Sequence, residues 1–575
     1  MVNLTINNRP VSVEEGTTIM QAASKIGINI PHLCYLKELN EIAACRVCVV
    51  EIAGNERLTP SCNTICQEGM KVYTNSPKVR NARRTMIRLI LSQHNCECTA
   101  CVRSGNCALQ KVAYELGVHT DAYHQDIPRR EWDQTFPLIK DESKCIKCMR
   151  CVQVCDKIQG LNIWDVVNTG CHTRVAVKDN KKICDADCSL CGQCITHCPV
   201  AALHEREDIV KVLTALNDPE VVTVVQIAPA VRAAWGEDLS MKPELATEKR
   251  LAAILKAMGF DFVFDTNFAA DLTIMEEGNE FVGRFTRGEL DKFPMFTSCC
   301  PGWMRYAKTQ YPEILDYIST AKSPQQMFGA TVKSYFAKKT GIDPKKIFSV
   351  SIMPCVAKKA ECDIPVMNDA GAGQDVDCVI TTREFARIVE MESIDPEYVD
   401  ECEFDSPLGT YTGAAVIFGA TGGVMEAALR TGYNIITGEN PPLDVFNDVR
   451  GMKPWKEFNV KIGDIEVKTA VVHGLKNAGK LIDALKAGEV KYHFVEVMAC
   501  PGGCVGGGGQ PIHEGVEMAE SRAPKLYSLD KNAKLRFSHE NPEVIAAYEE
   551  YFEKPNSEIA HHLLHTDHKS WEVHE

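Results

Sequence analysis

The sequence predicts a multidomain protein of mixed α+β and α/β class, in which small cysteine-rich units precede one larger α/β unit. The chain has 575 residues, which is more than one compact domain usually holds. Clusters of cysteines crowd the first ~200 residues, as expected of small units that bind metal. From residue 209 onward, apolar strand-like runs alternate with helical segments, and this alternation is typical of an α/β domain.

Charge and hydropathy narrow the class of function. The 63 basic and 77 acidic residues give a net charge of -14, which argues against nucleic-acid binding and favours small molecules or protein partners. No stretch reaches the ~18 apolar residues of a membrane span, and the opening MVNLTINNRPVSVEEG lacks a signal-peptide pattern. We therefore expect a cytoplasmic protein in which the clustered ones among its 27 cysteines are metal ligands or catalytic thiols rather than disulfides.

Residues 1–78 are expected to form a β-grasp domain that resembles plant-type [2Fe-2S] ferredoxins. Alternating side chains over 2–15 predict a β-hairpin with its turn at 7–9, and 17–27 predict a short helix. Two paired cysteines flanked by two single ones suit a [2Fe-2S] cluster, although the first gap is longer than usual. A zinc site is the alternative for these ligands, which are Cys34, Cys45, Cys48 and Cys62.

Residues 79–135 are expected to hold a [4Fe-4S] cluster with one histidine ligand. The apolar spacing over 79–93 predicts a helix that leads directly into an H-x3-C-x2-C-x5-C array. A histidine changes the charge of a cluster, so this ligation would tune its potential. Zinc is again the alternative, Cys96 is interpreted as a bystander, and the ligands are His94, Cys98, Cys101 and Cys107.

Residues 136–208 carry the motif C-x2-C-x2-C-x3-C twice, the signature of a bacterial ferredoxin with two [4Fe-4S] clusters. The fourth cysteine of each run reaches the other cluster, so the ligand sets should cross. One set is Cys145, Cys148, Cys151 and Cys198, and the other is Cys155, Cys188, Cys191 and Cys194. One [2Fe-2S] and three accessory [4Fe-4S] clusters in a row predict an electron-conducting chain.

Residues 209–520 are expected to form the catalytic domain in which the row of electron-carrying clusters ends. Apolar runs at 221–229, 348–355 and 492–500 predict strands, and chemistry usually lies at strand ends in α/β domains. The motifs there are TSCCPGW at 297–303, MPCVAKK at 353–359 and EVMACPGGCVGGGGQP at 496–511. The glycines of the last motif would let the backbone approach a bulky cofactor.

Three charged residues fall on one face of a predicted helix in the segment TIMEEGNEFVGR. Glu277, Glu280 and Arg284 have the spacing i, i+3 and i+7, so they could pass protons from the interior to the surface. A salt-bridged solvent face is the alternative. The spacing alone does not show whether Glu276 or Glu277 would be the inner member of this proton path.

The three motifs resemble the signatures of iron-only, or [FeFe], hydrogenases, and the resemblance extends over essentially the whole chain. It implies a catalytic H-cluster, which is a [4Fe-4S] cubane joined to a di-iron unit with CO, cyanide and an azadithiolate bridge. The cubane would be held by Cys300, Cys355, Cys500 and Cys504, and the thiolate of Cys504 would be shared with the di-iron unit.

The same resemblance implies roles for the residues around the cluster. Cys299 would pass a proton to the bridging amine, and the path to solvent would continue through Glu277, Ser319, Glu280 and Arg284. The di-iron unit would be surrounded by Pro229, Ala230, Gln325, Met353, Lys358, Phe418 and Met498. Lys358 would bind a cyanide, and Ala230 departs from members that have a serine there.

The resemblance leaves the electron partner open between ferredoxin and NAD(P)-linked, flavin-binding subunits of an electron-bifurcating complex. No GxGxxG unit follows a predicted strand, so nicotinamide chemistry is expected on another subunit, with slight preference for the complex-forming type. Maturation proteins would supply the di-iron unit. The alternatives in other classes are a non-catalytic electron-transfer subunit and a scaffold protein of iron-sulfur assembly.

The remaining cysteines and the C-terminus are expected to have structural rather than catalytic roles. Residues 521–575 are expected to form a helical segment whose His-rich end is a surface helix and tail. Packing is the default for the unassigned cysteines, which are Cys66, Cys96, Cys171, Cys184, Cys362, Cys378 and Cys402.

Overall fold

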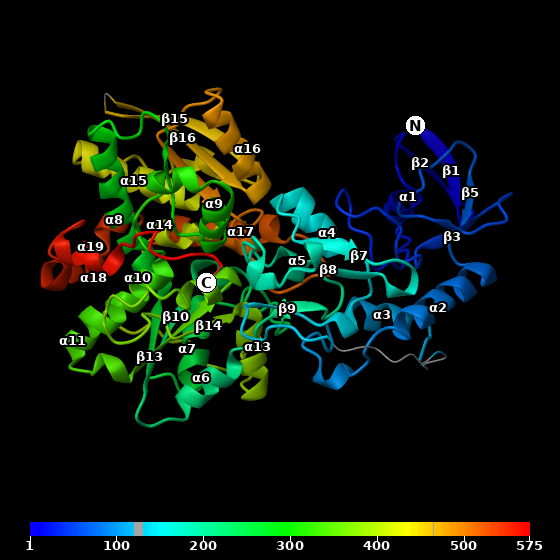
Figure 1. Ribbon diagram of the computed structural model, residues 1–575, viewed down its shortest axis with the longest axis horizontal. Helices are drawn as coiled ribbons and strands as arrows, with labels where there is room; N and C mark the ends of the chain where they lie inside the picture. The colour runs from blue at the N-terminus through cyan, green and yellow to red at the C-terminus, as the bar shows by residue number, and fades with distance from the viewer. Residues whose placement is uncertain (120–122, 124–129, 464, 575) are drawn as a thin grey trace.

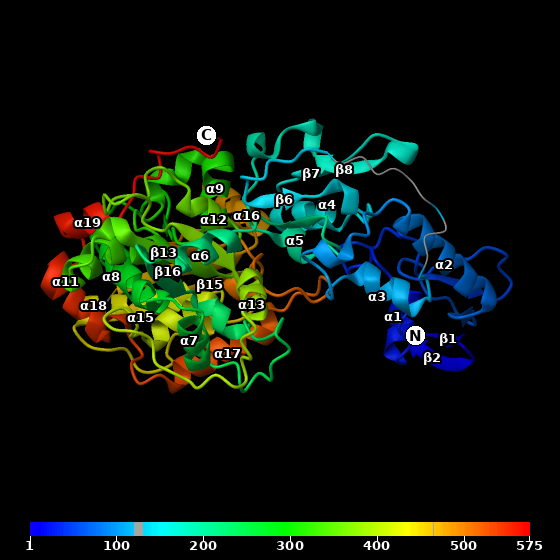
Figure 2. The same cartoon turned by 90° about the horizontal axis from the view of Figure 1, so that it is seen from below.

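The computed structural model describes residues 1–119, 123, 130–463 and 465–574, and its architecture is multidomain and mixed α/β, as expected. Two perpendicular views show an arm, coloured blue to cyan, beside a larger lobe coloured green to red (Figures 1 and 2). Within the described residues, no helix combines the length and the apolar character needed to cross a membrane.

The N-terminal part of the arm is a five-stranded sheet with the order β2-β1-β5-β3-β4. The predicted hairpin is confirmed, because β1 (Val2–Ile6) pairs antiparallel with β2 (Arg9–Val13). Asn7 and Asn8 have φ values of 49° and 64° in its turn, which suits the twist of the flanking strands. The other elements are α1 (Ile19–Lys25), β3 (Val49–Ile52), β4 (Thr59–Pro60) and β5 (Lys71–Tyr73).

The rest of the arm combines short helices with two small antiparallel sheets. The helix predicted over 79–93 is confirmed as α2 (Pro77–Leu91), and α3 (Ala108–Glu115) follows it. One small sheet pairs β6 (Leu138–Lys140) with β9 (Leu203–Glu205), and the other pairs β7 (Trp164–Val167) with β8 (Arg174–Val177). The cysteine runs adjoin the short helices α4 (Arg150–Val154) and α5 (Gln193–Thr196).

The lobe is built on two four-stranded sheets, and the three strands predicted in this region are confirmed as β10, β13 and β17. The first sheet is parallel and has the order β11 (Phe262–Asp265), β10 (Val222–Ile227), β13 (Ile347–Met353) and β14 (Cys378–Thr381). The second has the order β12 (Met295–Phe296), β17 (Phe494–Met498), β16 (Ile465–His473) and β15 (Trp455–Ile462), of which only β15 is antiparallel to its neighbour.

Helices surround both sheets (Figure 1). Those before β14 are α6 (Ile209–Leu216), α7 (Glu248–Ala257), α8 (Thr266–Thr286), α9 (Pro301–Gln310), α10 (Pro324–Thr331), α11 (Ala337–Thr340) and α12 (Ala357–Cys362). Those after it are α13 (Thr382–Met391), α14 (Gly413–Val416), α15 (Gly423–Thr437), α16 (Leu475–Lys486), α17 (Ala519–Asn532), α18 (Pro542–Ala547) and α19 (Glu558–Leu564).

The C-terminal segment does not form the surface tail expected from its composition. Leu564 is fully buried in an apolar core with Phe328 and Phe336, and its carbonyl accepts a hydrogen bond from the backbone N–H of Lys322. His565 and Trp571 are also buried. The expected surface helix is confirmed as α19, on which His561 and His562 are exposed, but the expected tail is wrong because Leu563 and Leu564 pack into the lobe and bring His565 with them.

The arm and the lobe are joined by buried hydrogen bonds. The side-chain amide of Gln193 donates to the carbonyl of Gly506 at 2.9 Å, and that of Gln159 donates to the carbonyl of Ala499 at 3.0 Å. Both acceptors lie in the motif at 496–511. The cysteine runs of the arm are therefore fixed directly against the last motif of the lobe.

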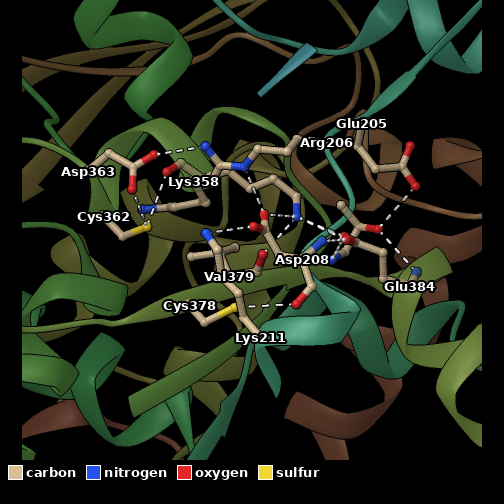
Figure 3. A network of polar contacts seen from close by, with 12 residues as sticks. Glu205, Arg206, Asp208, Lys211, Lys358, Cys362, Asp363, Cys378, Val379 and Glu384 are labelled. Carbon is tan, nitrogen blue, oxygen red and sulfur yellow. Dashed lines mark hydrogen bonds and ion pairs between the residues drawn. The ribbon is translucent and has the colours of Figure 1, made fainter. Parts of the chain in front are cut away.

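A buried network of charges lies where the chain passes from the arm into the lobe (Figure 3). The ammonium of Lys359 contacts Asp208 at 2.8 Å and Glu384 at 2.9 Å, and none of these side chains is more than 1% exposed. Burial opposes the charge of Asp208, but Lys359, Lys211 and Arg206 together outweigh this effect and lower the pKa of Asp208 to about 2. Lys359 thus compensates two carboxylates that water does not reach.

Replacing Lys359 by methionine is expected to lower the free energy of unfolding by about 3–5 kcal/mol, because the buried Glu384 would lose its cation while Asp208 would keep only Arg206 and Lys211. The stability from the depressed pKa of Asp208 is present above its ordinary 3.8 and is lost as the pH falls toward about 2, so the deficit should shrink there. Urea unfolding measures both effects. The control is Lys346→Met, which breaks an exposed pair with Glu220 and should cost under ~1 kcal/mol. Equal losses in the two variants would contradict this account.

Candidate active site

A cavity of about 740 Å³ lies at the carboxyl ends of strands from both sheets of the lobe. Pro229 follows β10, Met353 ends β13 and Met498 ends β17, and all three line the cavity. It also contains the other predicted cofactor neighbours, which are Ala230, Gln325, Lys358 and Phe418. The structure therefore brings the whole predicted set together at one site, in the position that α/β folds favour.

Five of the predicted cysteines converge on this cavity: Cys299, Cys300, Cys355, Cys500 and Cys504. Burial raises the pKa of every one of these thiols, that of Cys355 to about 12, and neighbouring thiols raise several of them further. A group of thiolates is therefore unfavourable here unless positively charged metal compensates it. The donor set and its dry surroundings fit an iron-sulfur cluster.

The glycines of the last motif are needed for contacts between backbone segments. A Cβ at Gly507 would lie 2.1 Å from the carbonyl oxygen of Pro354, and one at Gly508 would lie 2.4 Å from that of Cys191. Gly503 has a φ of 90°, which L side chains rarely adopt. The glycine run thus lets three loops meet around the cavity, whereas the sequence suggested only a close approach to the cofactor.

Among the described residues that line the cavity, Lys358 is the one that carries an ammonium. Its Nζ donates to the carbonyl of Cys299 at 3.2 Å and to Oε2 of Glu361 at 2.8 Å. Burial opposes its charge, but Glu361 outweighs this effect and raises the pKa of Lys358. Sequence reasoning missed Glu361, although its position three residues after Lys358 on α12 was a usable signal.

Gln325 belongs to the same polar group. Its side-chain amide donates to Glu361 at 3.1 Å, and its oxygen accepts from the hydroxyl of Ser351 at 3.1 Å. Ser323 also donates to Glu361, at 2.9 Å. Glu361 therefore fixes both Lys358 and Gln325 at the wall of the cavity.

Glu277 lies on the buried side of α8, next to the cavity. It is 1% exposed, and neither of its carboxylate oxygens has a hydrogen-bond partner among the described residues. Burial, reinforced by repulsion from Glu280, raises the pKa of Glu277 to about 8. Glu277 in turn contributes to the raised pKa of Cys299, so the two groups lie close together.

The outer members of the predicted path are joined by direct contacts. The hydroxyl of Ser319 donates to Oε2 of Glu280 at 2.7 Å, and Arg284 contacts Oε1 of Glu280 at 2.6 Å. Ser319 also acts on the pKa of Glu277, which it lowers against the effect of burial. Ser319 therefore lies between the two glutamates.

The structure gives Glu276 and Glu277 different partners, a difference that the spacing in the sequence could not show. Glu276 is fully buried and accepts hydrogen bonds from the hydroxyl of Tyr548 and, at 2.8 Å, from the backbone N–H of Asn556. Its Oε2 also lies 3.0 Å from Nε2 of His565. Glu276 thus faces the C-terminal segment, whereas Glu277 faces Ser319 and Cys299.

The predicted ligands of the first accessory unit also lie near one another. In the first unit, contact with Cys34 lowers the pKa of Cys45 to about 5, and contact with Cys62 lowers that of Cys48 to about 7. Within the described residues, no group of three or more His, Cys, Asp or Glu side chains closes on a single metal ion. The cysteines of the first unit are therefore neighbours that do not enclose a metal ion.

The two crossed sets of the third unit show the same proximity. Cys198 acts on the thiol pKa values of Cys145, Cys148 and Cys151. Cys155 likewise acts on the thiols of Cys191 and Cys194, as does Cys188. Because Cys151 also acts on the thiol of Cys194, the two groups lie close together, and the crossing of the ligand sets stays a prediction.

His94 and the cysteines of the second unit are arranged around a short loop. Nδ1 of His94 lies 3.0 Å from the carbonyl oxygen of Lys144, and a proton on Nδ1 would leave Nε2 able to bind metal. The backbone N–H of Cys101 donates to the carbonyl of Cys98 at 3.2 Å, and Cys101 acts on the thiol pKa of Cys107.

Four family models match the chain. The iron only hydrogenase large subunit, C-terminal domain, matches residues 221–508, and a 2Fe-2S iron-sulfur cluster binding domain matches 1–77. The iron-sulfur binding region of NADH-ubiquinone oxidoreductase-G matches 83–121, and the iron hydrogenase small subunit matches 516–571.

Known proteins are similar over nearly the full length. The NADP-reducing hydrogenase subunit HndD of Solidesulfovibrio fructosivorans is 48% identical over 98% of both chains. Iron hydrogenase 1 of Clostridium pasteurianum is 40% identical over 99% of this chain and 100% of its own. A solved structure of a variant of apo [FeFe]-hydrogenase HydA1 from Chlamydomonas reinhardtii has 43% identity and a TM-score of 0.56, covering 62% of this chain and 98% of its own. With a catalytic-domain model and relatives that match end to end, the chain belongs to the iron-only, or [FeFe], hydrogenases and is an enzyme that interconverts protons and electrons with hydrogen.

Proposed function

We propose that hydrogen turnover takes place in the cavity between the two sheets of the lobe. The observation that carries this proposal is the convergence of five thiols and one ammonium on this cavity. Cys300, Cys355, Cys500 and Cys504 hold the cubane of the H-cluster, and Cys504 also binds the di-iron unit. The bound cluster supplies the iron at which protons and electrons combine.

The other cavity residues hold and shield the di-iron unit. Lys358 uses two of its N–H donors on Cys299 and Glu361, which leaves one for a cyanide ligand. Met353, Phe418 and Met498 exclude water, together with Pro229 and Ala230. The amide of Gln325, fixed by Glu361, contributes a polar wall.

Protons reach the cavity through the residues of one path. The thiol of Cys299 exchanges a proton with the cofactor and with Glu277, whose raised pKa suits a group that carries a proton near neutral pH. Ser319 connects Glu277 with Glu280, and Arg284 holds Glu280 at the outer end.

Electrons reach the cavity through four accessory clusters held by the predicted sets in the arm. The thiol of Cys500 lies 3.7 Å from the carbonyl oxygen of Cys191, so the cubane and the cluster of Cys155, Cys188, Cys191 and Cys194 are neighbours. One [2Fe-2S] and three [4Fe-4S] clusters then lead outward through domains at 136–208, 79–135 and 1–78. The catalytic domain is 209–520, and 521–575 completes it.

We infer that the electron partner is an NAD(P)-linked complex rather than ferredoxin alone. The relative that is 48% identical over 98% of this chain is named a subunit of an NADP-reducing hydrogenase. The non-catalytic electron carrier and the assembly scaffold are not favoured, because the relatives that match end to end are named hydrogenases.

Anaerobic hydrogen evolution by the matured chain tests this function. The isolated chain should evolve hydrogen from reduced viologen but not from NADPH, because the sequence contains no dinucleotide-binding unit after a strand. Elution of the native protein only at the monomer mass of 63.7 kDa would contradict the complex, and hydrogen evolution from NADPH alone would contradict the need for a partner.

A further inference from the structure

Two hollows in the surface of the lobe meet at the C-terminal helix, outside the cavity described above. Each has a volume of about 1,100 Å³, and both are lined by Arg284, Asp316, Thr320, His561 and His565. His561 is exposed and its ring stacks on that of His565 at a centroid distance of 4.7 Å. Glu280, the outer carboxylate of the proposed proton path, also lines one of them.

A chain of hydrogen bonds connects Glu280 with His565. The hydroxyl of Thr320 lies 3.2 Å from Oε1 of Glu280 and 2.8 Å from Nδ1 of His565. Nε2 of His565 lies 3.0 Å from Oε2 of Glu276, which is fully buried. The carboxylate of Glu276 therefore orients the imidazole, as a buried carboxylate does for other proton-transferring histidines.

Arg284 holds Glu280 but cannot accept or release its protons, since a guanidinium stays protonated in proteins. An imidazole exchanges protons near neutral pH and can do so at either nitrogen. Arg284 and Thr320 both link Glu280 to the hollows. Of these two, Thr320 is the one whose hydrogen bonds lead to an imidazole, that of His565.

We propose that Thr320 and His565 form the outer leg of the proton path and exchange protons between Glu280 and the water of the hollows. During hydrogen oxidation, the carboxyl proton of Glu280 moves to the Thr320 oxygen while the hydroxyl proton of Thr320 moves to Nδ1 of His565. The imidazolium then releases one proton to water, and hydrogen evolution reverses each transfer. This inference rests on the proposed proton path through Glu280.

Charged and titratable groups from every neighbouring element face this branch or the hollows beside it. They are His561, His562, His568, Asp567 and Lys569 of the C-terminal segment, Glu276, Glu280, Arg284, Arg287 and Glu289 of α8 and its end, Asp316 and Tyr317, Asp369, and Tyr548. Burial lowers the pKa of His568, whose Nε2 lies 2.7 Å from the carbonyl oxygen of Ser319.

The test compares Thr320→Val and His565→Gln with wild-type holoenzyme in hydrogen evolution across pH 5–9. Valine removes the relay hydroxyl, whereas glutamine keeps a donor for Glu276. Each variant should be about tenfold slower, with a larger solvent deuterium isotope effect and partial rescue of His565→Gln by free imidazole. The double variant should be no slower than either single one, because both remove the same leg.

Two controls separate the possible failures. His562→Gln changes an exposed histidine of the same helix and should leave rate and pH profile unchanged. Glu280→Gln should slow turnover further and remove an infrared carboxyl band that shifts with pH. If Glu280→Gln is slow but the Thr320 and His565 variants match wild type, then Glu280 exchanges directly with water and the outer leg is overturned. If Glu280→Gln is also as fast as wild type, then the proposed path itself fails.

Discussion

Replacing Cys299 by alanine should lower hydrogen evolution by about 10²–10⁴-fold, the range typical for loss of a positioned proton-transfer group. Cys299 lines the cavity but is not one of the four proposed ligands. Burial raises its pKa, reinforced by Glu277, so the thiol keeps its proton until a nearby group takes it. The contact of Lys358 is with the backbone carbonyl of Cys299, which alanine preserves.

Activity must therefore be lost without loss of the cofactor. Iron content and the infrared bands of CO and cyanide should be those of wild type. Cys362→Ala is the matched control, because Cys362 is a thiol of the same lobe, 3% exposed, that does not line the cavity. Full activity in Cys299→Ala, or equal loss in both variants, would show that the thiol does not carry protons.

The second large effect is expected for Glu277→Gln, which should slow turnover by about 10²-fold or more while making the fold less sensitive to alkaline pH. Glutamine fills the same volume but cannot transfer a proton. The two measurements separate a catalytic role from a structural one. If Glu277 were only structural, its replacement would lower the rate and the stability together.

The sign of the pH effect follows from the raised pKa of Glu277. Its proton is held up to about pH 8 in the folded protein, compared with an ordinary 4.5. The stability that the protonated group contributes is full below 4.5 and is lost as the pH rises through about 8, so wild type should weaken over this interval. Thermal unfolding of both proteins at pH 6 and pH 9 measures this. A variant whose midpoint falls as steeply as that of wild type would contradict the buried, protonated state.

Local patterns predicted much of the fold, and the family resemblance named the residues that now lie together at the cavity. The hairpin at 2–15 and the strands β10, β13 and β17 follow from the period of their apolar residues, and the cavity lies at the ends of those strands. The cysteines converge there because each motif follows or adjoins a strand, and a sheet brings such ends together.

Contacts between distant segments could not be predicted in this way. The choice between Glu276 and Glu277 depends on how α8 is rotated against Tyr548 and His565, which lie more than 270 residues farther along the chain. The C-terminal histidines look like a solvated tail by composition, and only the packing of Leu564 shows otherwise. The glycines of the last motif are required by the backbones of Pro354 and Cys191, which no local pattern reveals.

The most direct test of the central claim is a crystal structure of the matured enzyme with anomalous diffraction measured at the iron edge. The account predicts iron density inside the cavity, contacting Cys300, Cys355, Cys500 and Cys504, with a di-iron unit beside Cys504 and within reach of Lys358. An active enzyme whose cavity contains no iron, or whose iron there is bound by other residues, would contradict it.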